Sequence, residues 1–178
     1  AMGPKPIAQC TAAEARAQPG LAMALSRILK DGPGDQGVGM EFRLLPGPAG
    51  DIRARVYTPP AADGPPPVIL YLHGGGWVIG DLDSYDATPR ALCRRTGAIV
   101  VSAHYRQAPE FRFPAAHLDA RAAWDWLHAQ AGTLGADASR SAIVGEGSGA
   151  NMAVNIALAA RAEDGPRPQH IVLLTPMV

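Results

Sequence analysis

The sequence predicts an α/β fold whose sheet is mostly parallel and doubly wound. From Val68 onward, continuous apolar runs alternate with stretches of helical periodicity in the order β-α-β-α-β-α-β, as expected for strands buried on both faces of a parallel sheet. Ahead of these runs, residues 38–45 and 52–58 suit two strands on either side of the turn sequence Gly47-Pro-Ala-Gly50. The turn predicts an antiparallel hairpin at one edge, so the expected sheet is mixed.

The composition is that of a globular chain with no electrostatic preference for a polyanion. Of the 178 residues, 47% are hydrophobic and 18% are charged, and the formal net charge is zero. This balance argues against binding of nucleic acid or of an anionic membrane surface. The chain shows no apolar run long enough to span a membrane and no signal-peptide pattern, so we expect a cytoplasmic protein. Its two cysteines, at positions 10 and 93, lack metal-ligand spacing and are expected to be packing residues.

The remaining elements follow from periodicity and from turn residues. Residues 8–30 are rich in Ala and carry Leu21, Leu25 and Leu29 on one face, which predicts two short helices separated at Pro19-Gly20. Residues 32–37 fit the letters G-x-G-x-x-G, but they follow a helix and precede a strand, the reverse of what phosphate binding requires, so we interpret them as a linker. Beyond the hairpin we expect strands at 68–72, 98–102, 143–144 and 171–174, and helices at 84–96, 114–130 and 149–162.

The stretch from Ser141 to Met152, SAIVGEGSGANM, carries the strongest functional signal. An apolar strand enters a cluster of glycines, and an Ala-rich helical sequence follows. This strand–turn–helix is where α/β enzymes place a nucleophile or a phosphate. The stretch is therefore a nucleophile elbow, a dinucleotide-binding loop, or a disabled copy of either.

Two further motifs accompany this turn. The letters HGGGW at 73–77 follow a buried strand, and YRQAPE at 105–110 is followed by FPAA at 113–116 and by Asp119. Together with GEGSGAN at 145–151, they resemble the hormone-sensitive-lipase-like esterase branch of the α/β-hydrolase superfamily, whose elbow reads GDSAGGN. The resemblance covers residues 38–178 and is specific, because three motifs fall in the right order on the right elements. It implies an α/β-hydrolase fold and ester hydrolysis, in which the acyl group is transferred from the ester to a serine nucleophile.

The resemblance also implies roles for the residues of these motifs. Backbone N–H groups aimed at a developing oxyanion lower the barrier to acyl transfer, and glycines leave room for that approach. The implied N–H donors are Gly74, Gly75 and Ser148, and the residues implied to support the loops are His73, Gly76 and Glu146. His73 is not expected to be the triad base, because in this fold the base follows the nucleophile in the chain. Arg106, Glu110 and Asp119 are expected to form structural ion pairs.

The register of the elbow puts the family's serine at position 147, where this chain has Gly147. The only hydroxyl nearby belongs to Ser148. If Ser148 were the nucleophile, Glu146 and Ala150 would occupy the flanking positions, and a glutamate is hard to accommodate where the elbow needs a near-absent side chain. We therefore interpret Gly147 as an emptied nucleophile position. Both an engineered replacement and a natural loss fit this interpretation.

The triad aspartate and histidine of the family are also absent from this chain. After position 147 the only histidine is His170, and the acids are Glu163 and Asp164, all too early for the family's acid and base. We interpret residues 1–35 as an N-terminal helical cap segment and 36–178 as the N-terminal portion of a hydrolase domain. The C-terminal part of the fold is expected as further residues, as a separate chain, or as a deleted part.

These observations predict a carboxylic-ester hydrolase that lacks its nucleophile, with a small-molecule ester or acid as ligand, no cofactor and no metal. A non-catalytic receptor or scaffold on the same fold is the main alternative. A dinucleotide-binding protein is less favoured, because Glu163 and Asp164 precede the next strand instead of ending it. Trp77, Tyr85 and Leu21 are candidate pocket residues, each equally compatible with core packing. A homo-oligomer is compatible with the sequence.

Overall fold

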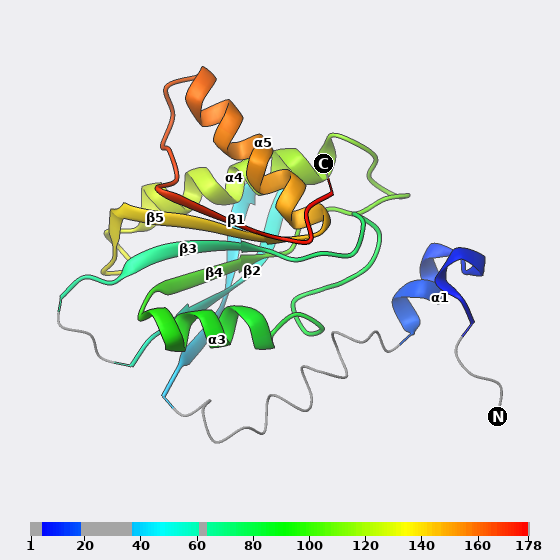
Figure 1. Cartoon of the computed structure of the whole chain (residues 1–178), viewed down its shortest axis with the longest axis horizontal. Coiled ribbons are helices and arrows are strands. Elements are labelled where there is room, and N and C mark those ends of the chain that lie inside the picture. The colour runs from blue at the N-terminus through cyan, green and yellow to red at the C-terminus, as the bar shows by residue number, and fades with distance from the viewer. Residues whose placement is uncertain (1–4, 19–36, 61–63, 178) are drawn as a thin grey trace.

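A six-stranded mixed sheet forms the centre of the molecule (Figure 1). The structure is a computed structural model and describes residues 5–18, 37–60 and 64–177. The strands are β1 (Gly39–Gly47), β2 (Gly50–Thr58), β3 (Pro67–Leu72), β4 (Ile99–Ala103), β5 (Asp137–Glu146) and β6 (His170–Leu174). Their order across the sheet is β1-β2-β4-β3-β5-β6.

The strand pairing confirms the expected mixed sheet. β1 and β2 form the antiparallel hairpin, in which Gly47 pairs with Gly50, and β2 joins β4 in antiparallel orientation. β3 pairs in parallel with both β4 and β5, and β5 pairs in parallel with β6. The parallel strands therefore end at one edge of the sheet, where the HGGGW and GEGSGAN motifs both begin.

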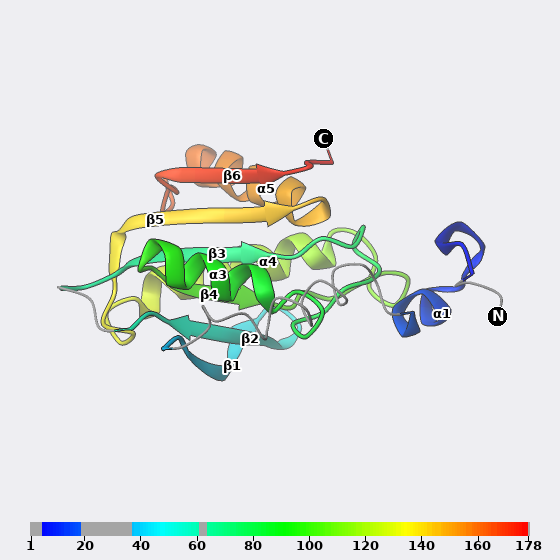
Figure 2. The ribbon, with the colours of Figure 1, turned by 60° about the horizontal axis from the view of Figure 1, so that its bottom comes forward.

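Helices cover both faces of the sheet (Figure 2). α4 (Ala115–Gln130) and α5 (Ser148–Ala162) pack together on one face, and α3 (Ala87–Thr96) lies on the other. A 3₁₀ turn (Ile7–Gln9) and α1 (Ala12–Ala17) lie beyond the carboxyl ends of the parallel strands. Thr11 and Glu14 form a capping box that starts α1, because each side chain accepts from the other residue's backbone N–H.

Two apolar clusters hold these layers together. The larger one joins β1–β5 to α4 and α5 around the fully buried Trp124, and the smaller one joins β2–β5 to α3 around Tyr57 and Tyr71. Cys93 lies in the smaller cluster as expected, whereas Cys10 is only half-buried beside α1. Polar atoms are also paired inside: Asp86 accepts from Arg55 and from Tyr57 under the sheet.

Each element predicted within the described residues is present, and the boundaries differ most at the starts of the first helix, which begins at Ala12 instead of Ala8, of β5 and of α3. β5 begins at Asp137 instead of near Ile143. Its first residues are mostly polar, so they show no run of apolar residues from which a strand could be predicted. α3 begins at Ala87 instead of Ser84, because the Asp81 carboxylate accepts from the backbone N–H groups of Asp83 and Ser84 and holds a separate turn there. The predicted second N-terminal helix and the predicted linker, except for its last residue Gly37, lie outside the described residues.

The central strand predicts where the fold is most sensitive to cavity formation. Leu70 of β3 is fully buried between β4 and β5, so Leu70→Ala is expected to lower the free energy of unfolding by about 2–5 kcal/mol. The same change at Leu118 of α4, whose side chain is 50% exposed, is expected to cost less than about 1 kcal/mol. Urea denaturation of both variants measures the difference, and equal losses would contradict this description of the core.

Candidate active site

The turn between β5 and α5 has the geometry of a nucleophile elbow. Gly147 is the single residue between strand and helix, with φ 50° and ψ −112°, a conformation that residues with side chains rarely adopt. Gly145 and Gly149 flank it at two residues on either side. A Cβ on Gly149 would lie 2.6 Å from the His73 carbonyl oxygen, and one on Gly145 would lie 2.6 Å from the Ala150 Cα. Neither position accepts a side chain without a backbone shift.

Position 147 differs from its neighbours, because a side chain fits there. A Cβ built on Gly147 meets only the Gly74 Cα, at 3.9 Å, which is ordinary van der Waals contact. A side chain at 147 therefore projects toward the HGGG loop. The pattern of two crowded glycines around one open position matches G-x-S-x-G centred on residue 147. This geometry supports the register inferred from the sequence.

Ser148 is placed for a different role. Its side chain is completely buried, and its Oγ lies 3.4 Å from the Tyr105 hydroxyl under the elbow. A register centred on Ser148 would also require Glu146 and Ala150 at the crowded positions. The hydroxyl of Ser148 thus faces the interior, while its backbone N–H belongs to the first turn of α5.

The HGGG loop is held in shape through its carbonyl oxygens. Gly75 has φ 115°, and a Cβ there would lie 2.7 Å from the Ile79 carbonyl carbon, so glycine is required. The Gly75 oxygen accepts from the N–H groups of Val78 and Ile79. The Gly74 oxygen accepts from His73 Nδ1 at 2.7 Å. The loop is therefore ordered by bonds that do not use the N–H groups implied as oxyanion donors.

His73 is a buried, neutral anchor of this loop. The side chain is fully buried, and its ring stacks on Tyr105 at 4.4 Å between centroids and on Tyr85 at 5.3 Å. Burial lowers the pKa of His73 to about 4, against the smaller opposing effect of its bond to Gly74. The Tyr105 hydroxyl donates to the His73 carbonyl oxygen at 2.9 Å. Tyr85, a candidate pocket residue, thus packs on this histidine.

Tyr105 makes contacts at the site that the sequence did not predict. Its hydroxyl lies within 3.4 Å of both His73 and Ser148, so it connects the HGGG loop to the elbow. The motif YRQAPE marked the residue as part of a pattern, but nothing in its spacing shows this contact. Beside it, Tyr71 of β3 donates from its hydroxyl to the Glu146 carboxylate at 2.6 Å, which anchors the end of β5.

The charged residues of the second motif form ion pairs, as predicted. Arg106 makes a bidentate pair with the buried Asp119, with Arg106 Nη2 at 2.7 Å from Asp119 Oδ1. Glu110 pairs with Arg16 of α1, and the same guanidinium donates to the backbone oxygens of Val78 and Ala108. Arg16 therefore holds α1 against the loop that follows β3 and against the loop that contains the YRQAPE motif. No local signal predicts this contact, because its partners are 62 to 94 residues away in the chain.

A cavity of about 440 Å³ opens beside the HGGG loop. Aromatic and amide side chains line most of it, contributed by Trp77, Phe111, Phe113, His117, Asn151 and Asn155. Trp77 lines the cavity as the sequence suggested, whereas the third candidate, Leu21, lies outside the described residues. The mixture of aromatic walls and a few polar groups is typical of small-molecule sites.

The end of β6 and the residues that follow it close the elbow from the side. Gly147 N–H donates to the Leu174 oxygen at 2.9 Å, and Asn151 Nδ2 donates to the Met177 oxygen at 2.8 Å. His117 Nε2 lies 3.1 Å from Asn151 Oδ1, an acceptor, and fixes the orientation of that amide. The elbow is thus braced by β6 and by α4 together.

The one histidine and the two acidic residues that follow the elbow in the sequence lie away from it. His170 is the first residue of β6 and pairs with Ala142, whereas Leu174 at the other end pairs with Glu146 next to the elbow. Glu163 caps the far end of α5 and pairs with Arg121, and Asp164 is in the exposed loop that follows. None of the three reaches position 147, as the sequence predicted.

Comparison with known proteins decides the family. A family profile described as "alpha/beta hydrolase fold" matches residues 69–178, which include all three motifs. The chain belongs to this family. Similar curated proteins include Esterase LipI of Mycobacterium tuberculosis, 44% identical over 80% of this chain and 46% of the relative. The ethyl acetate hydrolase of Pseudomonas putida is 45% identical over 68% of this chain and 40% of that relative.

Solved structures of esterases share the fold of this chain. A thermostable esterase from Pseudomonas putida ECU1011 superposes with a TM-score of 0.87 at 31% identity, over 99% of this chain and 54% of the other. The carboxylesterase EstE1, cloned from a metagenomic library, superposes with a TM-score of 0.85 at 36% identity, over 95% and 56%. The chain therefore spans about half the length of the relatives it matches. Among the described residues, no helix has the length and apolarity that crossing a membrane requires.

The crowding around the elbow predicts a contrast between two glycines. Gly149→Ala forces a Cβ into backbone atoms of β3 and is expected to lower the unfolding free energy by about 3 kcal/mol or more. Gly147→Ala meets no such contact and costs only the strain of its positive φ, about 1–2 kcal/mol. Thermal unfolding of the two variants tests this, and a larger loss at 147 than at 149 would contradict the proposed register.

The neutral state of His73 predicts a dependence of stability on pH. Its folded pKa of about 4 lies below the unfolded value of 6.5, so only the unfolded chain takes up this proton between those values. The contribution of neutral His73 to the unfolding free energy is full above pH 6.5, and it falls by on the order of 3 kcal/mol as the pH approaches 4. His73→Asn is expected to flatten the slope of unfolding free energy between pH 6.5 and 4.5. An NMR titration that finds His73 protonated near pH 6.5 in the folded protein would contradict this prediction.

Proposed function

We propose that this chain is the N-terminal part of an esterase-type hydrolase site that binds a small ester or carboxylic acid but lacks the nucleophile to cleave it. One observation carries the proposal: residue 147 has elbow geometry and room for a side chain facing Gly74, yet it is glycine. Gly74, Gly75 and Ser148 N–H are the proposed oxyanion donors, with His73, Gly76 and Glu146 as supports. The carboxylesterase names of the relatives support this substrate class.

The chemistry that remains follows from the groups present. Without a hydroxyl at 147 no acyl-enzyme forms, and loss of a nucleophile costs on the order of a millionfold in turnover. The N–H donors of the HGGG loop and of α5 still favour a carbonyl or carboxylate oxygen between them. The cavity lined by Trp77 and Phe113 accepts the adjoining apolar group. Binding without turnover is the expected behaviour.

The triad acid and base are proposed to come from a C-terminal part of the same fold. β6 forms an edge of the described sheet and exposes 37–45% of each residue from Ile171 to Leu174, which suits further structure packed against it. We also propose residues 1–35 as a cap segment over residues 36–178. Arg16 supports this assignment, because it fastens α1 to the loops beside the cavity.

The proposal is tested by placing a hydroxyl at the elbow of the full-length protein. Gly147→Ser is expected to raise hydrolysis of short-chain p-nitrophenyl esters by about 10³-fold or more over the unaltered protein. Gly147→Ala is the matched control, because it carries the same Cβ and the same backbone strain without the hydroxyl. Initial rates of the three proteins, with folding checked by circular dichroism, give the comparison.

Several outcomes separate the possible functions. Equal rates for the serine and alanine variants would show that position 147 is not the nucleophile site. Rapid hydrolysis by the unaltered protein would contradict the proposal that it cannot cleave an ester. If the folded serine variant hydrolyses nothing while the unaltered protein binds a short carboxylic acid by calorimetry, the chain is a non-catalytic receptor. Glycine at position 147 favours the receptor function, because a receptor needs no hydroxyl there and glycine adopts the positive φ without strain.

A further inference from the structure

The outer strand β1 carries a self-complementary sequence along an open edge. β1 lies at the opposite end of the sheet from β6, and within the described residues it is paired only with β2. Its central residues read Met40-Glu41-Phe42-Arg43-Leu44. An open edge offers unpaired N–H and C=O groups to another strand. The question is which strand this edge fits.

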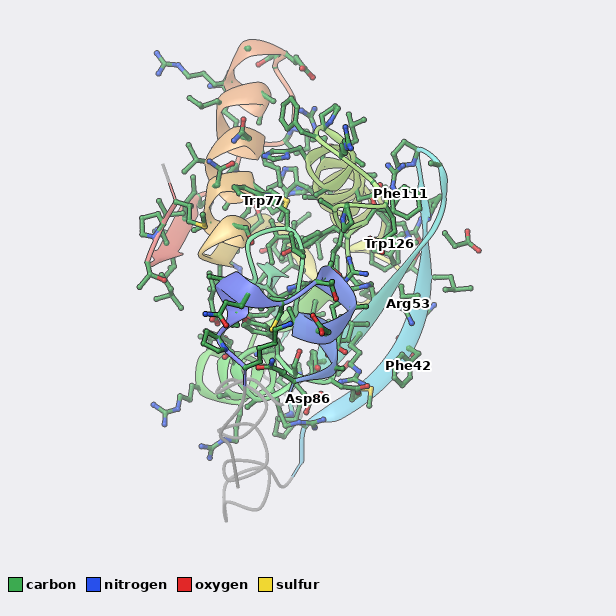
Figure 3. The ribbon with its side chains drawn as sticks, turned by 90° about the vertical axis from the view of Figure 1, so that its right-hand side faces the viewer. Phe42, Arg53, Trp77, Asp86, Phe111 and Trp126 are labelled. Carbon is green, nitrogen blue, oxygen red and sulfur yellow. The ribbon has the colours of Figure 1, made fainter. Side chains whose placement is uncertain are left out.

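One face of β1 exposes an apolar stripe. Met40, Phe42 and Leu44 are 40%, 66% and 64% exposed, unusually high for three apolar residues in one strand. They alternate along the strand and pair with Tyr57, Arg55 and Arg53 of β2, so they share the α3 face. Figure 3 shows Phe42 and Arg53 at the outer margin of the hairpin, away from Trp77. The inner side of the Phe42 ring is covered by the Arg55 guanidinium, 4.8 Å from its centroid.

The other face of β1 carries one acid and one base. Glu41 and Arg43 pair with Val56 and Ala54, so they lie on the face opposite the stripe. They form an exposed ion pair within the strand, with Arg43 Nη2 at 2.7 Å from Glu41 Oε1. Each side chain remains 45–49% exposed and open to a further partner. An exposed pair of this kind adds little to folding, so it can be altered without unfolding the chain.

An antiparallel copy of β1 satisfies both faces at once. When two copies pair about a two-fold axis at Phe42, Phe42 meets its own copy, Met40 faces Leu44, and Glu41 faces Arg43. Opposite charges directly across two strands attract, and apolar cross-strand pairs exclude water. Pro46 has no N–H to donate and ends the pairing beyond Leu44. A parallel copy in register would instead place like charges side by side.

We propose that two copies of this protein associate through β1, in antiparallel orientation about Phe42, to form one continuous sheet. The interface is isologous, because each copy supplies the same stripe and the same ion pair. It lies across the sheet from the elbow and does not depend on what occupies position 147. The occupant is a second copy because the charge order along Glu41-Phe42-Arg43 is complementary to itself when reversed.

The proposal is tested by charge reversal in the full-length protein with sedimentation velocity over a range of concentrations. The unaltered protein is expected to form a dimer. Glu41→Lys leaves two bases on each strand and Arg43→Glu leaves two acids, so each single variant is expected to weaken the dimer about tenfold or more. The double variant E41R/R43E is expected to dimerise like the unaltered protein. An equimolar mixture of the two single variants is expected to form a mixed dimer.

The controls separate this interface from others. Arg167→Glu makes the same charge change as Arg43→Glu at a distant exposed ion pair, and it is expected to leave the dimer unchanged. Phe42→Ser removes the centre of the stripe and is expected to weaken the dimer at least about tenfold. An unaltered protein that stays monomeric up to about 100 μM would overturn the proposal, whatever covers the strand. A dimer unaffected by both single reversals would also overturn it, because the contact would then lie elsewhere.

Discussion

The close packing of α5 against the end of β3 determines the geometry of the whole site. Gly149 approaches the Leu72 and His73 carbonyl groups so closely that no Cβ fits between them, and Gly145 is equally crowded by Ala150. α5 can approach β3 this closely only if the single residue that joins β5 to α5 turns sharply, and this turn gives Gly147 its positive φ. The turn directs position 147 toward Gly74. The approach of two backbones therefore creates the place where a nucleophile would stand.

This close packing constrains the residues around position 147 but leaves room at position 147 itself. The glycines at 75, 145 and 149 are required by the backbone. His73 and Tyr105 hold loops together through buried hydrogen bonds, and Glu146 does so through a partly buried one. Their loss would cost stability in any protein with this fold. A side chain at 147 would meet no such contact but would be strained by the positive φ, which glycine adopts without strain. The residues around the turn and the residue at its tip are therefore under different physical constraints.

The two edges of the sheet differ in what they offer. β6 is short, parallel to its neighbour and exposes apolar residues. Its last residue, Leu174, accepts from Gly147 N–H, and Met177 beyond the strand accepts from Asn151. β1 belongs to an antiparallel hairpin, alternates apolar and charged residues, and lies far from the elbow across the sheet. The first edge suits continuation of the same fold. The alternation on the second edge suits a strand that completes a surface with another molecule.

Local sequence determined the mixed α/β sheet, the hairpin and the strand–turn–helix around Gly147, because buried parallel strands, turn residues and glycine spacing are properties of short segments. It fell short at Asp137 and Ser84, where polar residues extend a strand or form a turn without any periodic signal. Only the tertiary structure brought Tyr105 to Ser148 and Arg16 to Glu110, since the partners are distant in the chain. The room at Gly147 was likewise decided in three dimensions, because a letter in a motif does not show which neighbours surround it.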